Sequence, residues 1–265
     1  MNDFSFYRIE KKGEGEPVLF LHGFTGTGDT WKEIASSIPC HAVMPDLAGH
    51  GRTLSATFNL EAEAKAMKQI MDDAEILSFH VVGYSMGGRL ALALAILYPT
   101  SVRSLVLESA SPGLDTEAER ELRRQSDEKL AQKIEQDGIE TFVDFWENIP
   151  IFETQKSLSA PIRESMRRER LSQSKSGLAS SLRGMGTGAQ KSYWNRLHDL
   201  TMPVLLLTGT LDQKFTNIAR RMKTSIPNCK WIEFDGAGHA VHVEQREKFG
   251  TIVKTFLFDI KGRQF

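Results

Sequence analysis

At 265 residues, with 40% hydrophobic and 25% charged residues, the chain has the size and composition of one large globular α/β domain with room for an insertion. Its formal net charge of -1 gives no reason to expect nucleic acid or a membrane surface as a partner. The two cysteines, Cys40 and Cys229, are too few for a disulfide framework and lack the spacing of metal ligands, so no disulfide and no metal site is expected.

The N-terminal stretch MNDFSFYRIEKKGEGEP contains no apolar core of the kind that marks a secretory leader. No window of the sequence approaches the roughly 18 uninterrupted apolar residues that a membrane span needs. We therefore expect a cytoplasmic protein. Polarity alternates over residues 4–10, which predicts a first strand at the edge of a sheet.

Short apolar runs bounded by glycine, proline and aspartate then recur between helical patterns. This alternation is typical of a mostly parallel sheet that helices cover on both faces. The predicted core strands are residues 18–22, 42–46, 79–83, 104–108, 204–209 and 231–235. The predicted helices are residues 59–75, 88–98, 216–226 and 243–260.

The regular alternation stops after Glu108 and resumes near Val204. Residues 113–199 contain no strand-like run, and helical stretches rich in arginine, glutamate and serine take its place. We interpret this segment as a helical cap inserted into the α/β core. The predicted core therefore consists of residues 1–112 and 200–265, with the cap spanning 113–199.

The stretch VVGYSMGG places Ser85 between glycines at a predicted strand-to-helix junction. Gly-x-Ser-x-Gly in this position is a nucleophile elbow, a turn too tight for side chains at the flanking positions. The serine hydroxyl is expected to project at the carboxyl end of the strand, beside the free N–H groups that begin the next helix. The alternative is a glycine-rich turn with an incidental serine.

A nucleophilic serine needs a base, and the base needs a carboxylate to orient it. In this type of fold the order along the chain is serine, then aspartate or glutamate, then histidine. Asp212 in GTLD and His239 in GAGH each follow a predicted strand, so we predict the catalytic set Ser85, Asp212 and His239. Glu108 is the alternative orienting acid. Three other histidines are expected to have structural or solvated roles: His22, His50 and His242.

The stretch HGFTG follows an early strand and matches the loop that supplies the second donor to an oxyanion. The predicted donors are the backbone N–H groups of Phe24 and Met86. A flexible glycine turn is the plainer interpretation, and it is compatible with this role.

Together, HGFTG, PDLAGHG, GYSMGG, GTLD and GAGH resemble the motifs of the α/β-hydrolase fold superfamily, in the right order across nearly the whole chain. The resemblance implies the α/β-hydrolase fold, with a mostly parallel central sheet of about seven or eight strands flanked by helices. It also implies a helical cap inserted after the sixth strand. The N-terminal region of this chain has room for one strand, so the first hairpin is expected to be shortened.

Arg89 is the only charged residue of the predicted helix GRLALALAILYP. The helix is apolar nearly all round and should be buried, and a cation in its first turn opposes the helix dipole. An unpaired buried charge is expensive, so Arg89 needs an explanation. It either forms an internal salt bridge or reaches water, or it awaits an anionic substrate near Ser85; we favour the substrate.

The predicted cap is rich in arginines, most of which we expect to be solvated and paired with glutamates of the same stretch. Such a cap could supply forked donors to substrate carboxylates. A cap over a site for neutral esters would instead be apolar. The cap arginines are Arg120, Arg123, Arg124, Arg163, Arg167, Arg168, Arg170 and Arg183.

A closer resemblance rests on GYSMGGRLAL, ESASPGL, RRQSD, FWENIPIF and SLRGMGTGAQKSYW, which span the core and most of the cap. They look like the 2-succinyl-6-hydroxy-2,4-cyclohexadiene-1-carboxylate synthases of menaquinone (vitamin K2) biosynthesis. That family implies a lyase that eliminates pyruvate from a cyclohexene carrying three carboxylates. By motif, the implied substrate-binding residues are Arg89, Arg123, Arg170, Tyr84 and Trp146, with Arg167 and Arg168 as neighbours that leave the alignment of Arg170 loose.

Under this hypothesis Ser85 accepts a proton through His239 and Asp212, and the oxyanion donors hold an enolate. No cofactor and no obligate protein partner are expected, and the predicted ligand is a small anionic molecule. Two alternatives stay open: a serine carboxylesterase or carbon–carbon-bond hydrolase for an acidic substrate, and a non-catalytic small-molecule receptor.

Overall fold

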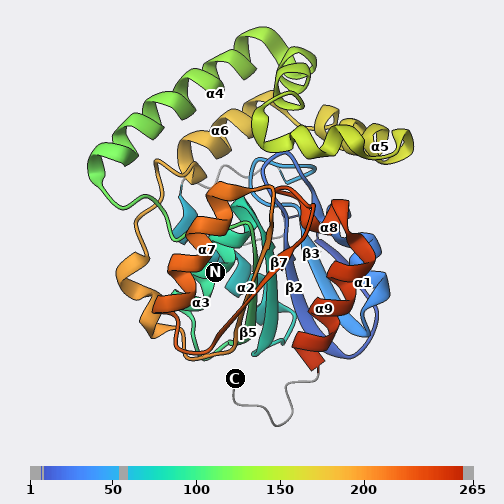
Figure 1. Ribbon diagram of the computed structural model, residues 1–265, viewed down its shortest axis with the longest axis vertical. Coiled ribbons are helices and arrows are strands. Elements are labelled where there is room, and N and C mark those ends of the chain that lie inside the picture. The colour runs from blue at the N-terminus through green and yellow to red at the C-terminus, as the bar shows by residue number, and fades with distance from the viewer. Residues whose placement is uncertain (1–6, 8, 54–58, 259–265) are drawn as a thin grey trace.

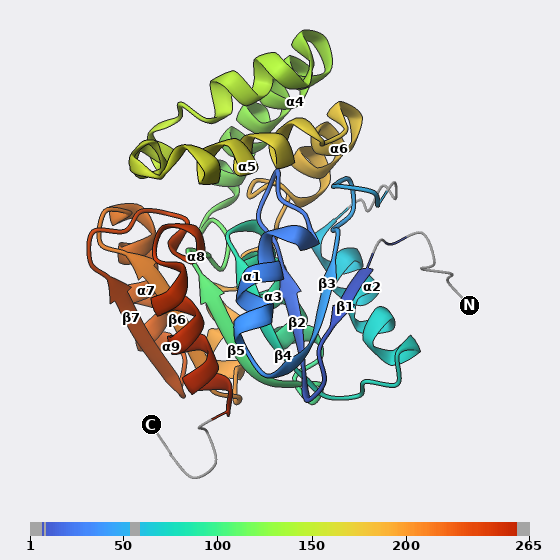
Figure 2. The same ribbon diagram turned by 90° about the vertical axis from the view of Figure 1, so that its right-hand side faces the viewer.

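The computed structural model describes residue 7 and residues 9–53 and 59–258, which form a seven-stranded sheet with helices on both sides (Figures 1 and 2). The strand order is β1-β3-β2-β4-β5-β6-β7, with β1 antiparallel to β3 and the other neighbours parallel. The strands are β1 Ile9–Lys12, β2 Glu16–Leu21, β3 Cys40–Pro45, β4 Phe79–Tyr84, β5 Val102–Glu108, β6 Val204–Gly209 and β7 Cys229–Phe234.

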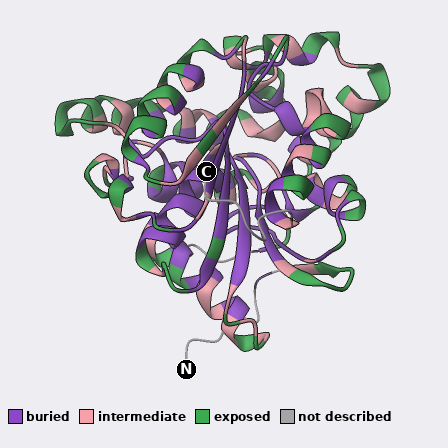
Figure 3. Cartoon of the chain, turned by 60° about the horizontal axis from the view of Figure 1, so that its bottom comes forward, coloured by how far each residue is buried: buried purple, intermediate pink, exposed green. Residues whose placement is uncertain are grey.

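Two apolar clusters sandwich the sheet, because its buried strands send alternate side chains to opposite faces. In β4, Val81 belongs to one cluster and Val82 to the other. The central strands are accordingly buried along most of their length (Figure 3). On one face lie α2 Leu60–Asp73, α3 Met86–Leu97 and α7 Gln213–Ser225; on the other lie α1 Lys32–Ser37 and α9 Arg246–Phe258.

The segment between β5 and β6 contains helices alone and forms a layer above the sheet (Figures 1 and 2). Its helices α4 and α6 pack around Ile134, Phe142 and Leu178, a core separate from the two sheet clusters. At the end of the segment, Leu197 packs into the sheet core instead. The elements are α4 Glu117–Trp146, interrupted at Gly138 with φ 85°, η2 Pro150–Ser157, α5 Ala160–Leu171, α6 Lys175–Met185 and η3 Trp194–Asp199.

Most core elements lie within a few residues of their predicted positions, and three differ. The edge strand β1 continues to Lys12, while residues 4–6 and 8 of its predicted range lie outside the described residues. The cap follows the fifth described strand and not the sixth, because a single described strand, β1, precedes β2. The described part of the predicted helix 243–260 belongs to two helices, α8 Val241–Glu244 and α9, separated at Gln245, while residues 259–260 lie outside the described residues.

Two short elements, η1 Gly28–Trp31 and α1, were not predicted, since their apolar residues are too few to show a helical period. None of the helices in the described part of the chain is long and apolar enough to cross a membrane.

Candidate active site

Ser85 lies between the end of β4 and the start of α3, in a backbone conformation that few residues adopt. Its φ is 49° and its ψ is -106°, which places it at a strained turn. The turn depends on absent side chains: an added Cβ at Gly83 would collide with the carbonyl of Gly87, and one at Gly87 with the carbonyl of Leu21. This is the geometry that a nucleophile elbow requires.

Ser85, His239 and Asp212 are joined in one hydrogen-bonded chain. His239 Nε2 lies 3.0 Å from Ser85 Oγ, and His239 Nδ1 lies 2.6 Å from Asp212 Oδ2. Because the carboxylate can only accept, Nδ1 carries the proton and Nε2 is left to accept the proton of the serine hydroxyl. Asp212 also accepts a hydrogen bond from the N–H of Phe215 at 3.3 Å, which fixes it at the start of α7.

The alternative orienting acid, Glu108, is occupied elsewhere. It is fully buried at the end of β5 and accepts hydrogen bonds from the Nδ1 and the backbone N–H of His242, at 2.9 and 3.0 Å. Burial lowers the pKa of His22 to about 4 and that of His50 to about 3, so both are neutral near pH 7. His22 accepts from Leu47 N–H and donates to the carbonyl of Gly23, a structural role.

The predicted oxyanion donors belong to Phe24, in the loop after β2, and to Met86, the first residue of α3. Phe24 and Met86 line the same cavity as Ser85. Within the described residues, neither of their backbone N–H groups donates a hydrogen bond to another group. Both groups therefore lack a protein acceptor in the described part of the chain, and Met86 begins α3, where the helix dipole is positive.

A cavity of about 770 Å³ opens above Ser85, with walls from both the cap and the carboxyl ends of the strands. The Tyr84 ring lies 5.3 Å from the His239 ring, and the Trp146 ring lies 5.4 Å from that of Phe24. All predicted site residues except Arg170 line this cavity: Phe24, Tyr84, Ser85, Met86, Arg89, Arg123, Trp146, Asp212 and His239.

Arg89 reaches this cavity from the first turn of α3 and is only 8% exposed. Its Nη1 donates to the side-chain oxygen of Gln190 at 2.8 Å, and in the part of the chain that the structure describes no carboxylate pairs with it. Burial, followed by the nearby charge of Arg123, lowers the pKa of Arg89 to about 10. Among the described residues, the internal salt bridge that the sequence left open is therefore not formed.

Three further cations line the cavity: Arg123, Lys214 and Arg221, the last of which pairs with Asp115 at 3.1 Å. Arg123 of α4 is 40% exposed and its Nε donates to Asp127 at 2.7 Å. Lys214, which sequence reasoning missed, lies two residues after Asp212; partial burial and then the charge of Arg123 lower its pKa. The position of Lys214 in the sequence could have indicated this role, because a residue just after a strand-end aspartate lies at the same edge of the sheet.

Arg170 does not line the cavity, contrary to the expectation from the resemblance. It is buried behind Phe152, whose ring centre lies 5.2 Å from the guanidinium. It donates to Gln155 at 2.9 Å and to Glu147 at 3.3 Å. Arg167 pairs with the same Glu147 at 2.7 Å, so these carboxylate and amide partners hold both arginines away from Ser85.

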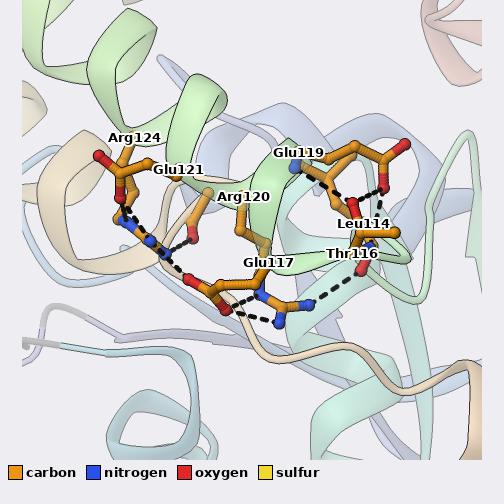
Figure 4. Close-up of polar contacts among 8 residues, drawn as sticks. Leu114, Thr116, Glu117, Glu119, Arg120, Glu121 and Arg124 are labelled. Atoms are coloured by element: carbon orange, nitrogen blue, oxygen red, sulfur yellow. Dashed lines mark hydrogen bonds and ion pairs between the residues drawn. The ribbon is translucent and has the colours of Figure 1, made fainter.

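Three other cap arginines, Arg120, Arg124 and Arg183, are paired with glutamates within the cap. At the start of α4, Arg120 and Arg124 both bind Glu117, and Arg124 also binds Glu121 (Figure 4). The same turn begins with a capping box between Thr116 and Glu119, drawn in the close-up. Arg89 differs from these arginines because its partner is neutral.

Within the described ranges, no three histidine, cysteine, aspartate or glutamate side chains are grouped so as to hold a metal ion. The lining of the cavity includes the Ser85 hydroxyl, the His239 imidazole and the cations described above.

Comparison with known proteins places the chain among several relatives. Residues 16–245 match the family model described as the alpha/beta hydrolase fold. A Bacillus subtilis protein provisionally named 2-succinyl-6-hydroxy-2,4-cyclohexadiene-1-carboxylate synthase is 41% identical over 96% of this chain and 95% of its own length. A Citrobacter koseri protein with that synthase name is 32% identical over 87% of this chain and 89% of its own. The solved structure of MenH from S. aureus superposes with a TM-score of 0.91 at 36% identity, covering 96% of this chain and 98% of that one.

Proposed function

Because the chain belongs to the α/β hydrolase fold family and, within it, to the 2-succinyl-6-hydroxy-2,4-cyclohexadiene-1-carboxylate synthases, we propose that it is a lyase of menaquinone biosynthesis. Its reaction is the elimination of pyruvate from a 5-enolpyruvoyl-6-hydroxy-2-succinylcyclohexene carboxylate. The substrate is a small molecule with three carboxylates, and we place the enzyme in the cytoplasm with no obligate protein partner.

One observation supports the proposal independently of the relatives: among the described residues, the buried Arg89 forms no ion pair, and it lines the same cavity as the hydrogen-bonded relay of Ser85, His239 and Asp212. Arg89 and Ser85 both face this cavity, and the partner of Arg89 is a neutral amide. A substrate carboxylate would supply an ion-pair partner and form a charge-assisted, forked pair. Arg123 and Lys214 add positive charge on the same walls.

The relay is suited to moving a proton. In the proposed mechanism, Ser85 Oγ removes the proton beside the succinyl carbonyl while its own proton passes to His239, and Asp212 stabilises the imidazolium. The N–H groups of Phe24 and Met86 hold the enolate oxygen. The electron pair then forms a ring double bond as the carbon–oxygen bond to the enolpyruvyl group breaks. Enolpyruvate leaves and takes up a proton to become pyruvate.

The decisive experiment follows pyruvate release by the purified protein from this substrate, coupled to NADH oxidation by lactate dehydrogenase. Spontaneous elimination is measured without protein and with Ser85→Ala. We expect turnover by the wild type alone. A wild-type rate equal to the spontaneous rate would refute the proposal.

A serine hydrolase acting on an acidic ester is the second candidate, since the same relay and free N–H donors serve acyl transfer. Burst kinetics with an aryl ester that carries a carboxylate, without pyruvate release from the cyclohexene, would favour it.

A further inference from the structure

The loop of residues 22–27 joins β2 to η1 and carries Phe24; we call it the oxyanion loop. Inside it, the N–H of Gly26 donates to the carbonyl of Gly23 at 3.1 Å. Thr25 has a φ of 70°, a conformation that a β-branched residue adopts only when its surroundings enforce it. Something must therefore hold this loop in place beside Ser85.

The first residue that holds the loop is Gln173, which lies between α5 and α6 of the cap. Its Nε2 donates to the carbonyl oxygens of Thr25 and Gly26, at 3.2 and 3.3 Å. Its side-chain oxygen accepts the N–H of Gly51, in another core loop, at 2.9 Å. Gln173 is only 5% exposed, so these bonds are shielded from water. One amide from the cap thus binds the strained residue and its neighbour.

The second residue that holds the loop is Glu169, in the last turns of α5. Its Oε1 accepts the N–H and the hydroxyl of Thr27 at 2.9 and 2.6 Å, and the hydroxyl of Thr30 at 2.9 Å. A partly buried carboxylate is costly unless several donors satisfy it, and here three donors from the core do so. The far end of the oxyanion loop is therefore bound to α5 of the cap.

We propose that Gln173 and Glu169 are positioning residues that hold the oxyanion loop from the cap, so that the N–H of Phe24 faces the oxygen that becomes negative. The proposal rests on the proposed function for the identity of that oxygen. It follows that the oxyanion hole is complete only while the cap is packed against the core. Neither residue lines the cavity above Ser85, so both act through the loop.

Gln173→Leu tests the positioning role of Gln173. A small displacement of an oxyanion donor slows the chemical step and leaves substrate binding largely intact, so we expect kcat to fall by about 10- to 100-fold with KM within about threefold. Gln132→Leu, the same change at an exposed position on α4, is the matched control and should keep the wild-type kcat. A raised KM with an unchanged kcat would overturn the proposal, because it would indicate a contact with substrate.

Variants of Glu169 test whether this residue positions the oxyanion loop or only stabilises the fold. Glu169→Gln keeps an oxygen that accepts from Thr27 N–H, so it should retain most of kcat, whereas Glu169→Ala should lose about as much as Gln173→Leu. Arg183→Gln, which breaks ion pairs between α6 and α4 without touching the loop, should lower Tm and not kcat. If Glu169→Ala lowered only Tm, as Arg183→Gln does, the role would be structural and the proposal would fail.

A second readout does not depend on the cyclohexene substrate. A fluorophosphonate reacts with the serine oxygen and loses fluoride, and the oxyanion donors stabilise its transition state. We expect Gln173→Leu to slow the labelling of Ser85, measured by intact mass, by about the factor seen in kcat. If wild type is labelled without releasing pyruvate, the proposed function fails while these rates still decide the role of the loop. Equal labelling of wild type and variant, or no labelling of wild type, would overturn the inference.

Discussion

Arg89 donates through Nη1 to the side-chain oxygen of Gln190 at 2.8 Å, a bond between residues 101 positions apart. Both side chains are buried, with 8% of Arg89 and 1% of Gln190 exposed. An amide oxygen accepts the hydrogen bond without cancelling the charge of the guanidinium. The pair therefore orients a cation at the cavity wall and leaves its charge for a ligand.

Replacing Gln190 with glutamate should neutralise this cation. Gln190→Glu should raise KM for the carboxylated substrate about tenfold or more, because the substrate then competes with an internal carboxylate, and should lower kcat less. Tm should stay level or rise, since the buried charge gains a partner. Gln132→Glu, on the exposed face of α4, is the control for added negative charge. Unchanged KM in Gln190→Glu would contradict a role for Arg89 in binding.

The guanidinium geometry of Arg89 should matter as well as its charge. Arg89→Ala should impair turnover of the anionic substrate severely, and Arg89→Lys should recover it in part, because lysine keeps the charge but not the forked donors. A small neutral ester, if it reacts, should be spared in both variants. Steady-state kinetics on both substrates and Tm check this. Equal losses on both substrates with a large drop in Tm would point to a structural role.

Ser85 and His239 should act as a unit. Each alanine variant should lower kcat by roughly 10³-fold or more, and the double variant should lose little beyond either one, because His239 acts through Ser85. Unchanged near-ultraviolet circular dichroism and Tm would establish that the fold is intact. Multiplicative losses in the double variant would be incompatible with the coupled relay.

Asp212→Asn should preserve the geometry but favour the wrong imidazole tautomer. We expect kcat to fall by about 10²- to 10⁴-fold. Glu108→Gln should have a smaller effect on kcat, since Glu108 binds His242 and not His239. The two variants compared in one pyruvate-release assay decide between the carboxylates, and near-normal activity of Asp212→Asn would transfer the orienting role elsewhere.

Stability should fall as the pH drops from about 6.5 to about 4. Burial lowers the pKa of His22 and of His80 to about 4, so between these pH values the unfolded chain binds protons that the folded chain excludes. Each such histidine contributes a slope of about 1.4 kcal/mol per pH unit. His80→Gln should reduce the slope of the unfolding free energy against pH, measured by urea denaturation at several pH values. The reduction should correspond to about one proton fewer taken up on unfolding. His198→Gln, whose side chain is 72% exposed, is the control, and an equal change in both variants would contradict the assignment.

The sequence was sufficient for the features that depend on local chemistry. The strand β6 begins with a continuous apolar run and β4 is apolar apart from His80, because both faces of these strands are buried, and such runs are visible without a structure. The turn at Ser85 was predictable from Gly83 and Gly87, whose missing side chains the tight backbone demands. The positions of Asp212 and His239 followed from their places after parallel strands, which end at one edge of the sheet.

The tertiary structure alone decided which partners these residues have. Nothing in the order of residues indicates that Gln190 binds Arg89, that Glu108 binds His242, or that Arg170 lies behind Phe152 and away from the cavity. Such contacts join residues from separate elements, and hydrogen bonds hold only within a few tenths of an ångström and a narrow range of angles. They depend on how the cap is seated on the sheet, which no local pattern specifies. The periodicity of the cap helices shows which face is apolar, but not which guanidinium meets a carboxylate and which meets an amide.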